Sequence, residues 1–318
     1  MVWFVIAVVV GLVVLVWSAE KFVSGATGLA QHWQMPPLLI GMLIMGFGTS
    51  APELAVSASA AAQGASGLAL GNAYGSNIAN IGLILGLTAI LHPVSVHSKV
   101  LKTELPVLLL LTLLVGWQLA DGRVTRLESI VLLVLAGVLT LWAVVRSKGE
   151  PDALSDDVSA PLSSQPVGVC VGWTVVGLVG LVGSARLLVW GAVNVARSWG
   201  VDEVVIGLTV VAVGTSLPEL AASFAAVRRG AHDLAFGNVL GSNLFNLLAV
   251  VGLAGVIHPF DVPAHVLGRD WVTMLAFSMA LLVMGYGFRG RIGRINRWEG
   301  AGLLACYAIY NGVLLSGR

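Results

Sequence analysis

Charged residues are scarce in this chain of 318 residues: Asp, Glu, Lys and Arg together make up 10% of it. A soluble domain carries about 25% charged residues, so this shortage excludes an ordinary soluble globular protein. Hydrophobic residues make up 57% of the chain and the mean hydropathy is +0.93, which indicates a membrane protein whose surroundings are the lipid bilayer. The net charge is +1 and no large basic cluster is present, so nucleic acid is not an expected partner.

Cysteine is equally rare, with Cys170 and Cys306 both in apolar surroundings. Two isolated cysteines without metal-ligand spacing exclude a disulfide framework and a zinc site. A basic segment before the first apolar stretch, 2–16, is also lacking. Because a cleaved signal peptide normally has such a segment, we interpret this stretch as the first membrane helix.

Long apolar segments are what the chain has in abundance. A membrane-spanning helix needs about 20 largely apolar residues, and the sequence predicts ten of them. Their predicted ranges are 3–31, 36–62, 68–91, 102–120, 125–146, 167–196, 201–227, 232–257, 266–287 and 296–316. A polar stretch at 148–166 separates a first five-helix half, 1–147, from a second half, 167–318, and we interpret it as a cytoplasmic linker.

The two halves share an internal repeat. The segment 48–54 (GTSAPEL) recurs as 214–220 (GTSLPEL), and 71–77 (GNAYGSN) recurs as 237–243 (GNVLGSN). The alignment runs without a gap from Ser18, which matches Ser184, to Pro93, which matches Pro259. Because five helices are an odd number, the second half enters the membrane from the opposite side, which is the inverted-repeat plan of many secondary transporters.

The basic residues predict the orientation. With the amino terminus outside, the inner loops hold eleven Lys and Arg residues and the outer side holds five, with Arg186 inside a helix left out. The positive-inside rule therefore favours both termini outside the cytoplasmic membrane. Arg186 aligns with Glu20, could pair with a residue near it, and lies far in sequence from both repeated motifs.

The second helix of each half carries the first motif. Pro52 lacks an N–H, so the carbonyl of Gly48 loses its helical partner, and such a carbonyl is tolerated in a membrane only where it faces protein or a wet cavity. Thr49 and Ser50 precede Glu53 by four and three residues, which allows their oxygens to share one face. The same spacing recurs in Thr215, Ser216 and Glu219.

The third helix of each half carries a polar stripe. Asn72, Ser76 and Asn80 are spaced four apart, and Asn238, Ser242 and Asn246 repeat the spacing. Glycine pairs accompany them, at 71 and 75 and at 237 and 241. Small and amide residues also hold membrane helices together, so for either helix alone helix packing is a competing explanation of the stripe.

The duplicated glutamates Glu53 and Glu219 point to bound ions. An acid at mid-bilayer costs about 3 kcal/mol on insertion scales, and no Lys or Arg is repeated near either one. We therefore expect both to be neutralised by bound cations, the alternative being two protonated structural acids. Carboxylate, hydroxyl, amide and carbonyl oxygens suit hard cations such as Ca²⁺ and Na⁺, and competition between these ions for one acid pair is a physical basis for exchange.

These paired motifs, Gly-Thr-Ser-x-Pro-Glu and Gly-Ser-Asn-x-x-Asn, resemble those of the cation/calcium exchanger superfamily, specifically prokaryotic sodium/calcium exchanger-like proteins. The resemblance covers nearly the whole chain. It implies an all-α integral membrane fold of ten helices in two inverted five-helix repeats, in which helices two, three, seven and eight bind ions and helices one and six slide across them. It implies a Na⁺/Ca²⁺ antiporter, not an enzyme, without a prosthetic group or an obligate protein partner.

The resemblance also implies a ligand set around one Ca²⁺ site at the glutamate pair and several Na⁺ sites. In the first half these ligands are the carbonyl of Gly46 and the side chains of Thr49, Ser50, Glu53, Ser76 and Asn80. In the second half they are the carbonyl of Ala212 and the side chains of Thr215, Ser216, Glu219, Ser242 and Asn246.

Two departures from the family pattern and three alternatives stay open. Some relatives have Asp where this chain has Asn246, which leaves the ion stoichiometry and K⁺ dependence undecided. The linker is too short for the large regulatory domain of animal exchangers. The nearest alternative is Ca²⁺/H⁺ exchange. More remote ones are an intramembrane hydrolase with Ser50 or Ser216 as nucleophile, which lacks a core histidine as base, and a cation channel.

Overall fold

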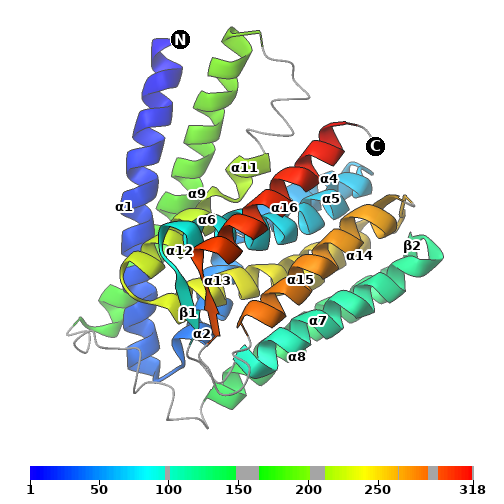
Figure 1. Ribbon diagram of the computed structural model, residues 1–318, viewed down its shortest axis with the longest axis horizontal. Helices are drawn as coiled ribbons and strands as arrows, with labels where there is room; N and C mark the ends of the chain where they lie inside the picture. The colour runs from blue at the N-terminus through cyan, green and yellow to red at the C-terminus, as the bar shows by residue number, and fades with distance from the viewer. Residues whose placement is uncertain (97–100, 148–164, 201–211, 264, 286–292, 317–318) are drawn as a thin grey trace.

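The computed structural model describes residues 1–96, 101–147, 165–200, 212–263, 265–285 and 293–316. The protein is almost entirely helical (Figure 1). The first half consists of α1 (Val2–Trp33), α2 (Pro37–Ile40), η1 (Gly41–Gly46), α3 (Phe47–Thr49), α4 (Ala51–Ala62), α5 (Ser66–Ala79), η2 (Asn80–Leu85), α6 (Gly86–Leu91), β1 (Val94–Val96), α7 (Leu101–Gln118), η3 (Leu119–Asp121), β2 (Arg123–Val124) and α8 (Arg126–Ser147).

The second half follows the same order after the linker, most of which lies outside the described residues. It consists of α9 (Val167–Ser198), α11 (Ala212–Thr215), α12 (Leu217–Arg228), α13 (His232–Phe245), η6 (Asn246–Val250), α14 (Val251–Ile257), β3 (Phe260–Asp261), η7 (Val266–Trp271), α15 (Val272–Gly285), β4 (Gly293–Ile295) and α16 (Arg297–Leu315). The segments η1, η2, η6 and η7 are π-helical.

The ten predicted membrane segments correspond to these helices. In the described part of the chain, seven helices are long and apolar enough to cross a membrane, and the bent pair α2–α3 and α4 makes an eighth. The ninth is α16, and the tenth consists of α11 and α12 together with 201–211, which the structure does not describe.

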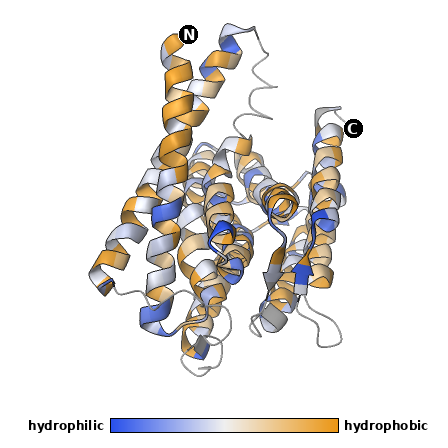
Figure 2. Cartoon of the chain, turned by 60° about the vertical axis from the view of Figure 1, so that its left-hand side comes forward, coloured by the Kyte–Doolittle hydropathy of each residue, from blue (hydrophilic) through white to orange (hydrophobic). Residues whose placement is uncertain are grey.

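The two longest helices, α1 and α9, stand side by side at one edge of the molecule, and the other helices are inclined to them (Figure 1). Small residues allow their close contact: a Cβ added at Gly25 would lie 2.5 Å from the Thr174 nitrogen, and one at Gly177 would lie 2.5 Å from the Phe22 nitrogen. Their outward faces are apolar, as the orange colour of α1 in Figure 2 shows, and exposed valines such as Val9 and Val13 suit contact with lipid.

The second membrane helix is interrupted at Ser50. The segments Pro37–Thr49 and Ala51–Ala62 meet at an angle of 44°, and Pro52 lies in the first turn of α4, where a missing N–H is tolerated. The residue whose missing N–H frees the Gly48 carbonyl therefore lies directly after the interruption. The interruption brings Glu53 into the first turn of a new helix whose N-terminus lies inside the protein.

Two short antiparallel strand pairs connect the halves. Val94 to Val96 in β1 pair with Ile295 to Gly293 in β4, and Arg123 and Val124 in β2 pair with Asp261 and Phe260 in β3. In the ten-helix order, β1 and β4 lie in the loops after the third and ninth helices, and β2 and β3 lie in the loops after the fourth and eighth. Each strand pair therefore joins loops that the topology assigns to the same side.

Candidate functional site

Glu53 and Glu219 lie in the first turns of α4 and α12, at the interrupted helices of the two halves. Each is 1% exposed, and they are close enough for their charges to interact. Ser50 Oγ donates to Glu219 Oε1 over 3.5 Å, which links the first motif to the second. The Oε2 atom of each glutamate is buried without a hydrogen-bond partner, so the pair has unused acceptors facing the protein interior.

An identical amide clamp holds the backbone of each glutamate. Asn72 Nδ2 donates to the Glu53 carbonyl over 3.1 Å and to Ser57 Oγ over 2.9 Å. Asn238 Nδ2 donates to the Glu219 carbonyl over 3.2 Å and to Ser223 Oγ over 2.9 Å. These asparagines of the polar stripe therefore position the glutamates through the main chain. Sequence reasoning found the stripe, but it did not distinguish the two clamps.

The hydroxyls of one side of the site are tightly packed. Thr49 Oγ1 donates to the Met45 carbonyl over 2.9 Å, with Asn238 Oδ1 at 3.3 Å and Ser242 Oγ at 3.5 Å. Ser242 Oγ donates to the Gly46 carbonyl over 3.3 Å, which also accepts the Ser50 N–H. The predicted ligands Thr49, Ser242 and the Gly46 carbonyl therefore contact one another.

Glycines make this packing possible. A Cβ at Gly237 would collide with the Leu38 carbonyl, and one at Gly241 would collide with the Met42 carbonyl, because α13 crosses α2 and η1 at backbone contact. The small-residue spacing at 237 and 241 therefore does what the sequence predicted. At Gly71 and Gly75 no described atom lies within 4 Å of an added Cβ; the segment 201–211, which matches 35–45 in the repeat, lies outside the described residues.

On the other side of the site the structure describes Ser76, Thr215 and Ser216, while 201–211 lies outside the described residues. Thr215 is half-buried and lines a cavity of about 280 Å³ together with Gly214, Pro52 and Pro218. Ser76 and Ser216 are buried, at 6% and 2% exposed. Ala212 is the first described residue of its helix, so its predicted carbonyl ligand lies at the edge of the described segment.

Arg186 borders the same cavity as Thr215. It lies in the wall of this cavity, beside the side chains of Val182 and Val189 on α9, although it is far in sequence from both motifs. Its counterpart Glu20 faces another residue: Arg228 Nη1 lies 3.8 Å from Glu20 Oε1. A positive charge therefore borders the cavity that Thr215 lines. The sequence alone does not indicate this proximity, because it arises only when the chain folds.

A second layer of amides lies beside the glutamates. Asn80 Nδ2 donates to Asn243 Oδ1 over 3.1 Å, and Asn77 Nδ2 donates to the Asn243 carbonyl over 3.2 Å. The Oδ1 atoms of Asn77, Asn80 and Asn246 are buried and unpartnered. Asn80 and Asn246 each begin a π-helical segment, a local widening that is frequent at functional sites. Asn77 and Asn243 belong to the repeated motif, but sequence reasoning did not assign them a role.

The donor set limits what this site can hold. Within the described ranges, no three His, Cys, Asp or Glu side chains gather as a transition-metal site would require. Two carboxylates surrounded by amide, hydroxyl and carbonyl oxygens suit hard cations instead. A multi-pass membrane protein with two inverted repeats and this oxygen-rich centre belongs to the class of secondary transporters.

Comparison with known proteins gives the family. The sodium/calcium exchanger protein family matches residues 3–145 and 169–315. A putative antiporter CaxA of Alkalimonas amylolytica is 45% identical, with 98% of each chain covered. The sodium/calcium exchanger MaX1 of Methanosarcina acetivorans is 32% identical over 96% of each chain. The structure of the sodium-calcium exchanger NCX_Mj, soaked with Na⁺ and Ca²⁺, superposes with a TM-score of 0.84 at 31% identity, covering 99% of this chain and 98% of that one.

The chain belongs to the sodium/calcium exchanger family. Its fold is the all-α fold of that family, with ten membrane helices. It is a cation/Ca²⁺ antiporter of the membrane and not an enzyme.

Proposed function

We propose that this protein exchanges Na⁺ for Ca²⁺ by alternating access, with both ions competing for Glu53 and Glu219. The observation that carries the proposal is the mirrored pair of buried acids, each with an unpartnered Oε2. No Lys or Arg of the described chain forms an ion pair with either one. Buried charges need compensation, and a cation between the two carboxylates supplies it.

Charge matching explains the competition. Two ionised carboxylates give the site a charge near −2, which one Ca²⁺ or two Na⁺ neutralise, and a third Na⁺ leaves a net positive charge. Asn80 and Asn246 add neutral amide oxygens, as do the hydroxyls of Thr49, Ser50, Ser76, Thr215, Ser216 and Ser242, and the carbonyls of Gly46 and Ala212 complete the proposed ligand set. An empty site buries two like charges, so the protein changes state most readily when it is loaded.

The described contacts around the site support alternating access. Thr49, Ser242 and Gly46 contact one another at the packed side, whereas Thr215 borders a cavity at the other. The helices α1 and α9 meet through small residues, and both contact α12. We propose that they slide as a unit across the ion-binding helices and open each side of the site in turn.

We further propose that the halves 1–147 and 167–318 form the two repeats of a cytoplasmic-membrane protein with both termini outside. The strand pairs β1–β4 and β2–β3 are compatible with this topology, because each joins loops assigned to one side. Cysteine labelling tests the orientation: an impermeant thiol reagent added to intact cells is expected to modify a cysteine at position 122 and not one at position 230.

Ca²⁺ uptake into proteoliposomes, with the Na⁺ and H⁺ gradients set independently, tests the function. We expect uptake to require an outward Na⁺ gradient at equal pH on both sides. Uptake driven by a pH difference alone, without Na⁺, would establish Ca²⁺/H⁺ exchange instead. Glu53→Gln and Glu219→Gln are expected to abolish uptake, while Glu128→Gln, the same change at an acid in the first turn of α8 and outside the proposed site, is expected to preserve it.

A further inference from the structure

A group of buried amides beside the proposed ion site includes two residues outside the proposed ligand set. Asn77 and Asn243 occupy the same place in the two repeats, 166 positions apart, and they are 2% and 1% exposed. Asn80 and Asn246, which belong to the proposed ligand set, follow them by three residues. Each half therefore carries one buried amide that is a proposed ligand and one whose role is open.

An amide serves as a cation ligand only when its oxygen faces the ion. Its two terminal atoms have nearly the same size, but the oxygen accepts hydrogen bonds whereas the nitrogen donates them. A buried amide nitrogen also needs an acceptor, because an unsatisfied donor costs free energy. The direction of a buried Asn ligand is therefore set by the place where its nitrogen finds an acceptor.

Asn243 supplies this acceptor to Asn80. Asn80 Nδ2 donates to Asn243 Oδ1 over 3.1 Å, and Asn80 Oδ1 is buried without a hydrogen-bond partner. Asn80 begins η2, which contacts α12, and Glu219 lies in the first turn of α12. The Asn80 amide is thus held at its nitrogen, and its oxygen stays available to a cation bound at the glutamates.

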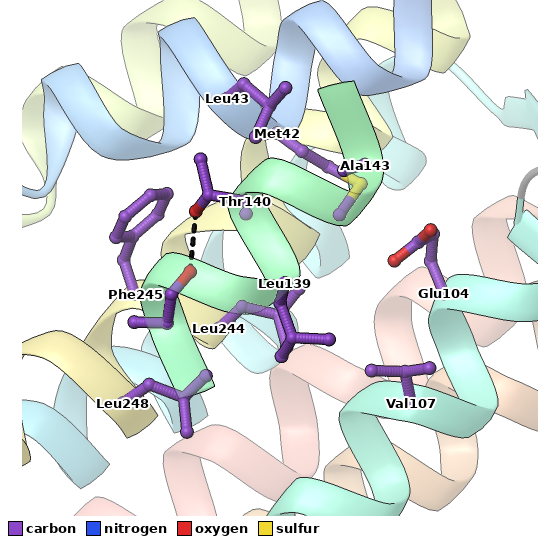
Figure 3. Close-up of a pocket in the computed structure, with 12 residues that line it drawn as sticks. Met42, Leu43, Glu104, Val107, Leu139, Thr140, Ala143, Leu244, Phe245 and Leu248 are labelled. Atoms are coloured by element: carbon purple, nitrogen blue, oxygen red, sulfur yellow. Dashed lines mark hydrogen bonds between the residues drawn. The ribbon is translucent and has the colours of Figure 1, made fainter. Parts of the chain in front are cut away.

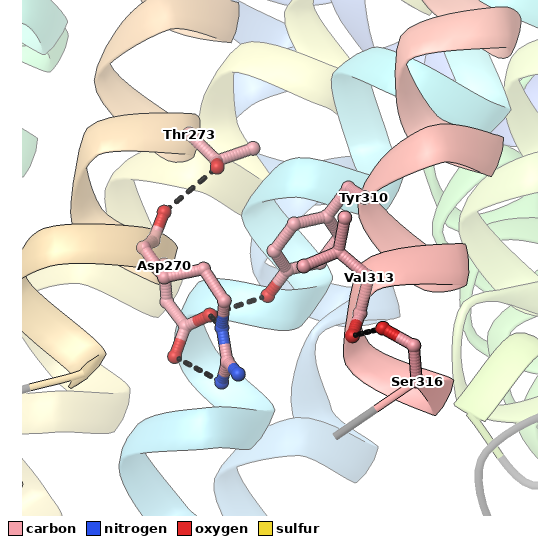
Figure 4. Close-up of polar contacts among 6 residues, drawn as sticks. Asp270, Thr273, Tyr310, Val313 and Ser316 are labelled. Carbon is pink, nitrogen blue, oxygen red and sulfur yellow. Dashed lines mark hydrogen bonds and ion pairs between the residues drawn. The ribbon is translucent and has the colours of Figure 1, made fainter. Parts of the chain in front are cut away.

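The main chain of Asn243 is supported from α5 and α15. Its carbonyl accepts a hydrogen bond from Asn77 Nδ2 over 3.2 Å, and the same nitrogen lies 3.4 Å from Met274 Sδ. Four residues before Met274, Asp270 accepts a hydrogen bond from the Tyr310 hydroxyl over 3.0 Å (Figure 4). The helix that carries Met274 is therefore attached to α16, and it supports the amides from behind.

The residues next to Asn243 face a different part of the protein. Leu244 and Phe245 line a largely apolar pocket between η1, α7, α8 and α13 (Figure 3). Asn243 instead contacts Asn77 and Asn80 of the first half. This turn of α13 therefore presents apolar side chains to α8 and the Asn243 amide to α5 and η2.

The matching amide of the second half is not held in this way. In a symmetric arrangement Asn246 would donate to Asn77, but Asn77 Oδ1 is buried without a partner, and its Nδ2 donates to the Asn243 carbonyl. Both Oδ1 and Nδ2 of Asn246 are buried without a hydrogen-bond partner. Within the described part of the chain, the Asn80 amide is therefore fixed in direction and the Asn246 amide is not.

We propose that Asn243 is a positioning residue that directs the Asn80 oxygen toward the transported cation. This inference rests on the proposed function, because it requires a cation at Glu53 and Glu219. Without an acceptor at position 243, the Asn80 N–H groups would turn to the unpartnered carboxylate oxygens of the glutamates and compete with the cation for them. Loss of a residue that orients a metal ligand lowers metal affinity by roughly 10–100-fold.

Equilibrium Ca²⁺ binding to the purified full chain tests the proposal with Asn243→Leu and Asn80→Asp. Leucine is similar in size but accepts no hydrogen bond, so we expect Asn243→Leu to raise the Kd for Ca²⁺ at least about tenfold. Aspartate at position 80 presents an oxygen in either direction, so adding Asn243→Leu to Asn80→Asp should change the Kd by less than about twofold. An equal rise in both backgrounds would overturn the proposal, because a residue that only supports folding acts whatever stands at position 80.

Two further variants distinguish positioning from folding. Asn243→Asp keeps an acceptor for the Asn80 N–H and should bind Ca²⁺ at least as tightly as the wild type. It decides the matter if the melting temperature without Ca²⁺ shows that Asn243→Leu is unfolded, and a tenfold loss in Asn243→Asp would overturn the proposal. Asn311→Leu is the control, since Asn311 Nδ2 donates to the Tyr307 carbonyl of its own helix, and a rise in Kd equal to that of Asn243→Leu would also overturn the proposal.

The same measurement separates this inference from the proposed function. Wild-type Ca²⁺ affinity in Glu53→Gln would place the cation elsewhere, and it would overturn the proposed function together with the role of Asn243. Weakened binding in Glu53→Gln with an unchanged Kd in Asn243→Leu would overturn the role of Asn243 alone.

Discussion

Replacing Asn238 by alanine removes the clamp that holds the Glu219 backbone. The side chain is fully buried, and its Nδ2 donates to the Glu219 carbonyl and to Ser223 Oγ, while its Oδ1 lies 3.3 Å from Thr49 Oγ1. Side-chain hydrogen bonds between membrane helices contribute about 0.6 kcal/mol on average and up to about 1.7 kcal/mol. Two such bonds, together with the small void left by the shorter side chain, predict a loss of about 2 kcal/mol in the free energy of unfolding.

Asn238→Ala should also weaken ion binding, because Glu219 loses the contact that positions its main chain. We expect the Kd for Ca²⁺ to rise about tenfold, which corresponds to about 1.4 kcal/mol. At a Ca²⁺ concentration of about 100 times the wild-type Kd, bound Ca²⁺ stabilises the wild type by about 2.7 kcal/mol. The variant should retain about half of that increment.

Thermal unfolding in detergent with and without Ca²⁺ measures both effects. Asn72→Ala is expected to behave similarly with a smaller loss of stability, because Asn72 is only partly buried. Asn194→Ala is the control, since Asn194 donates only to the Trp190 carbonyl of its own helix. If Asn238→Ala matched Asn194→Ala in both stability and Ca²⁺ response, the clamp would have no positioning role.

Three further predictions follow from individual contacts. Arg186→Gln removes a positive charge from the cavity beside Thr215. It should speed Ca²⁺ entry several-fold at low ionic strength but not near about 0.5 M salt, where salt screens an accessible charge. An equal gain in Arg126→Gln would contradict this. Gly237→Ala should destabilise the protein by about 1–3 kcal/mol, because its Cβ meets the Leu38 carbonyl, whereas Gly302→Ala, in open space, should not. Asp270→Asn should lower the free energy of unfolding by about 2 kcal/mol, because it leaves Arg269 without its carboxylate. Asp261→Asn, at the exposed ion pair with Arg123, should leave the melting temperature unchanged. Similar melting temperatures for the two variants would contradict a stabilising role for the Arg269–Asp270 pair.

The sequence predicts most of the fold because apolar length and aligned polar residues are local properties. The helix interruption beside Pro52 follows from a missing N–H, and the burial of Glu53 and Glu219 follows from their position within long apolar segments. The spacing of Asn72 and Asn238 predicts a polar stripe. That these amides hold the glutamate carbonyls depends on how α5 and α13 dock, which spacing alone does not determine.

Other features depend on tertiary contacts that no local pattern encodes. The π-helical turns at Asn80 and Asn246 lie within ordinary apolar segments, and Arg186 reaches its cavity only after α9 packs beside α12. Glu104 and Asp270 match in position, although they lie beyond Pro93 and Pro259, where the predicted repeat ends. Their different partners, Arg146 near Glu104 and Arg269 beside Asp270, are set by how the chain folds.

Equilibrium Ca²⁺ binding to the purified wild type and to the variants Glu53→Gln and Glu219→Gln tests most directly whether the mirrored glutamates hold one cation together. Each substitution removes one of the two negative charges next to the ion, so we predict that affinity falls by at least about a hundredfold in both variants, by comparison with other charged contacts of this kind. Wild-type affinity in either variant would contradict a shared site.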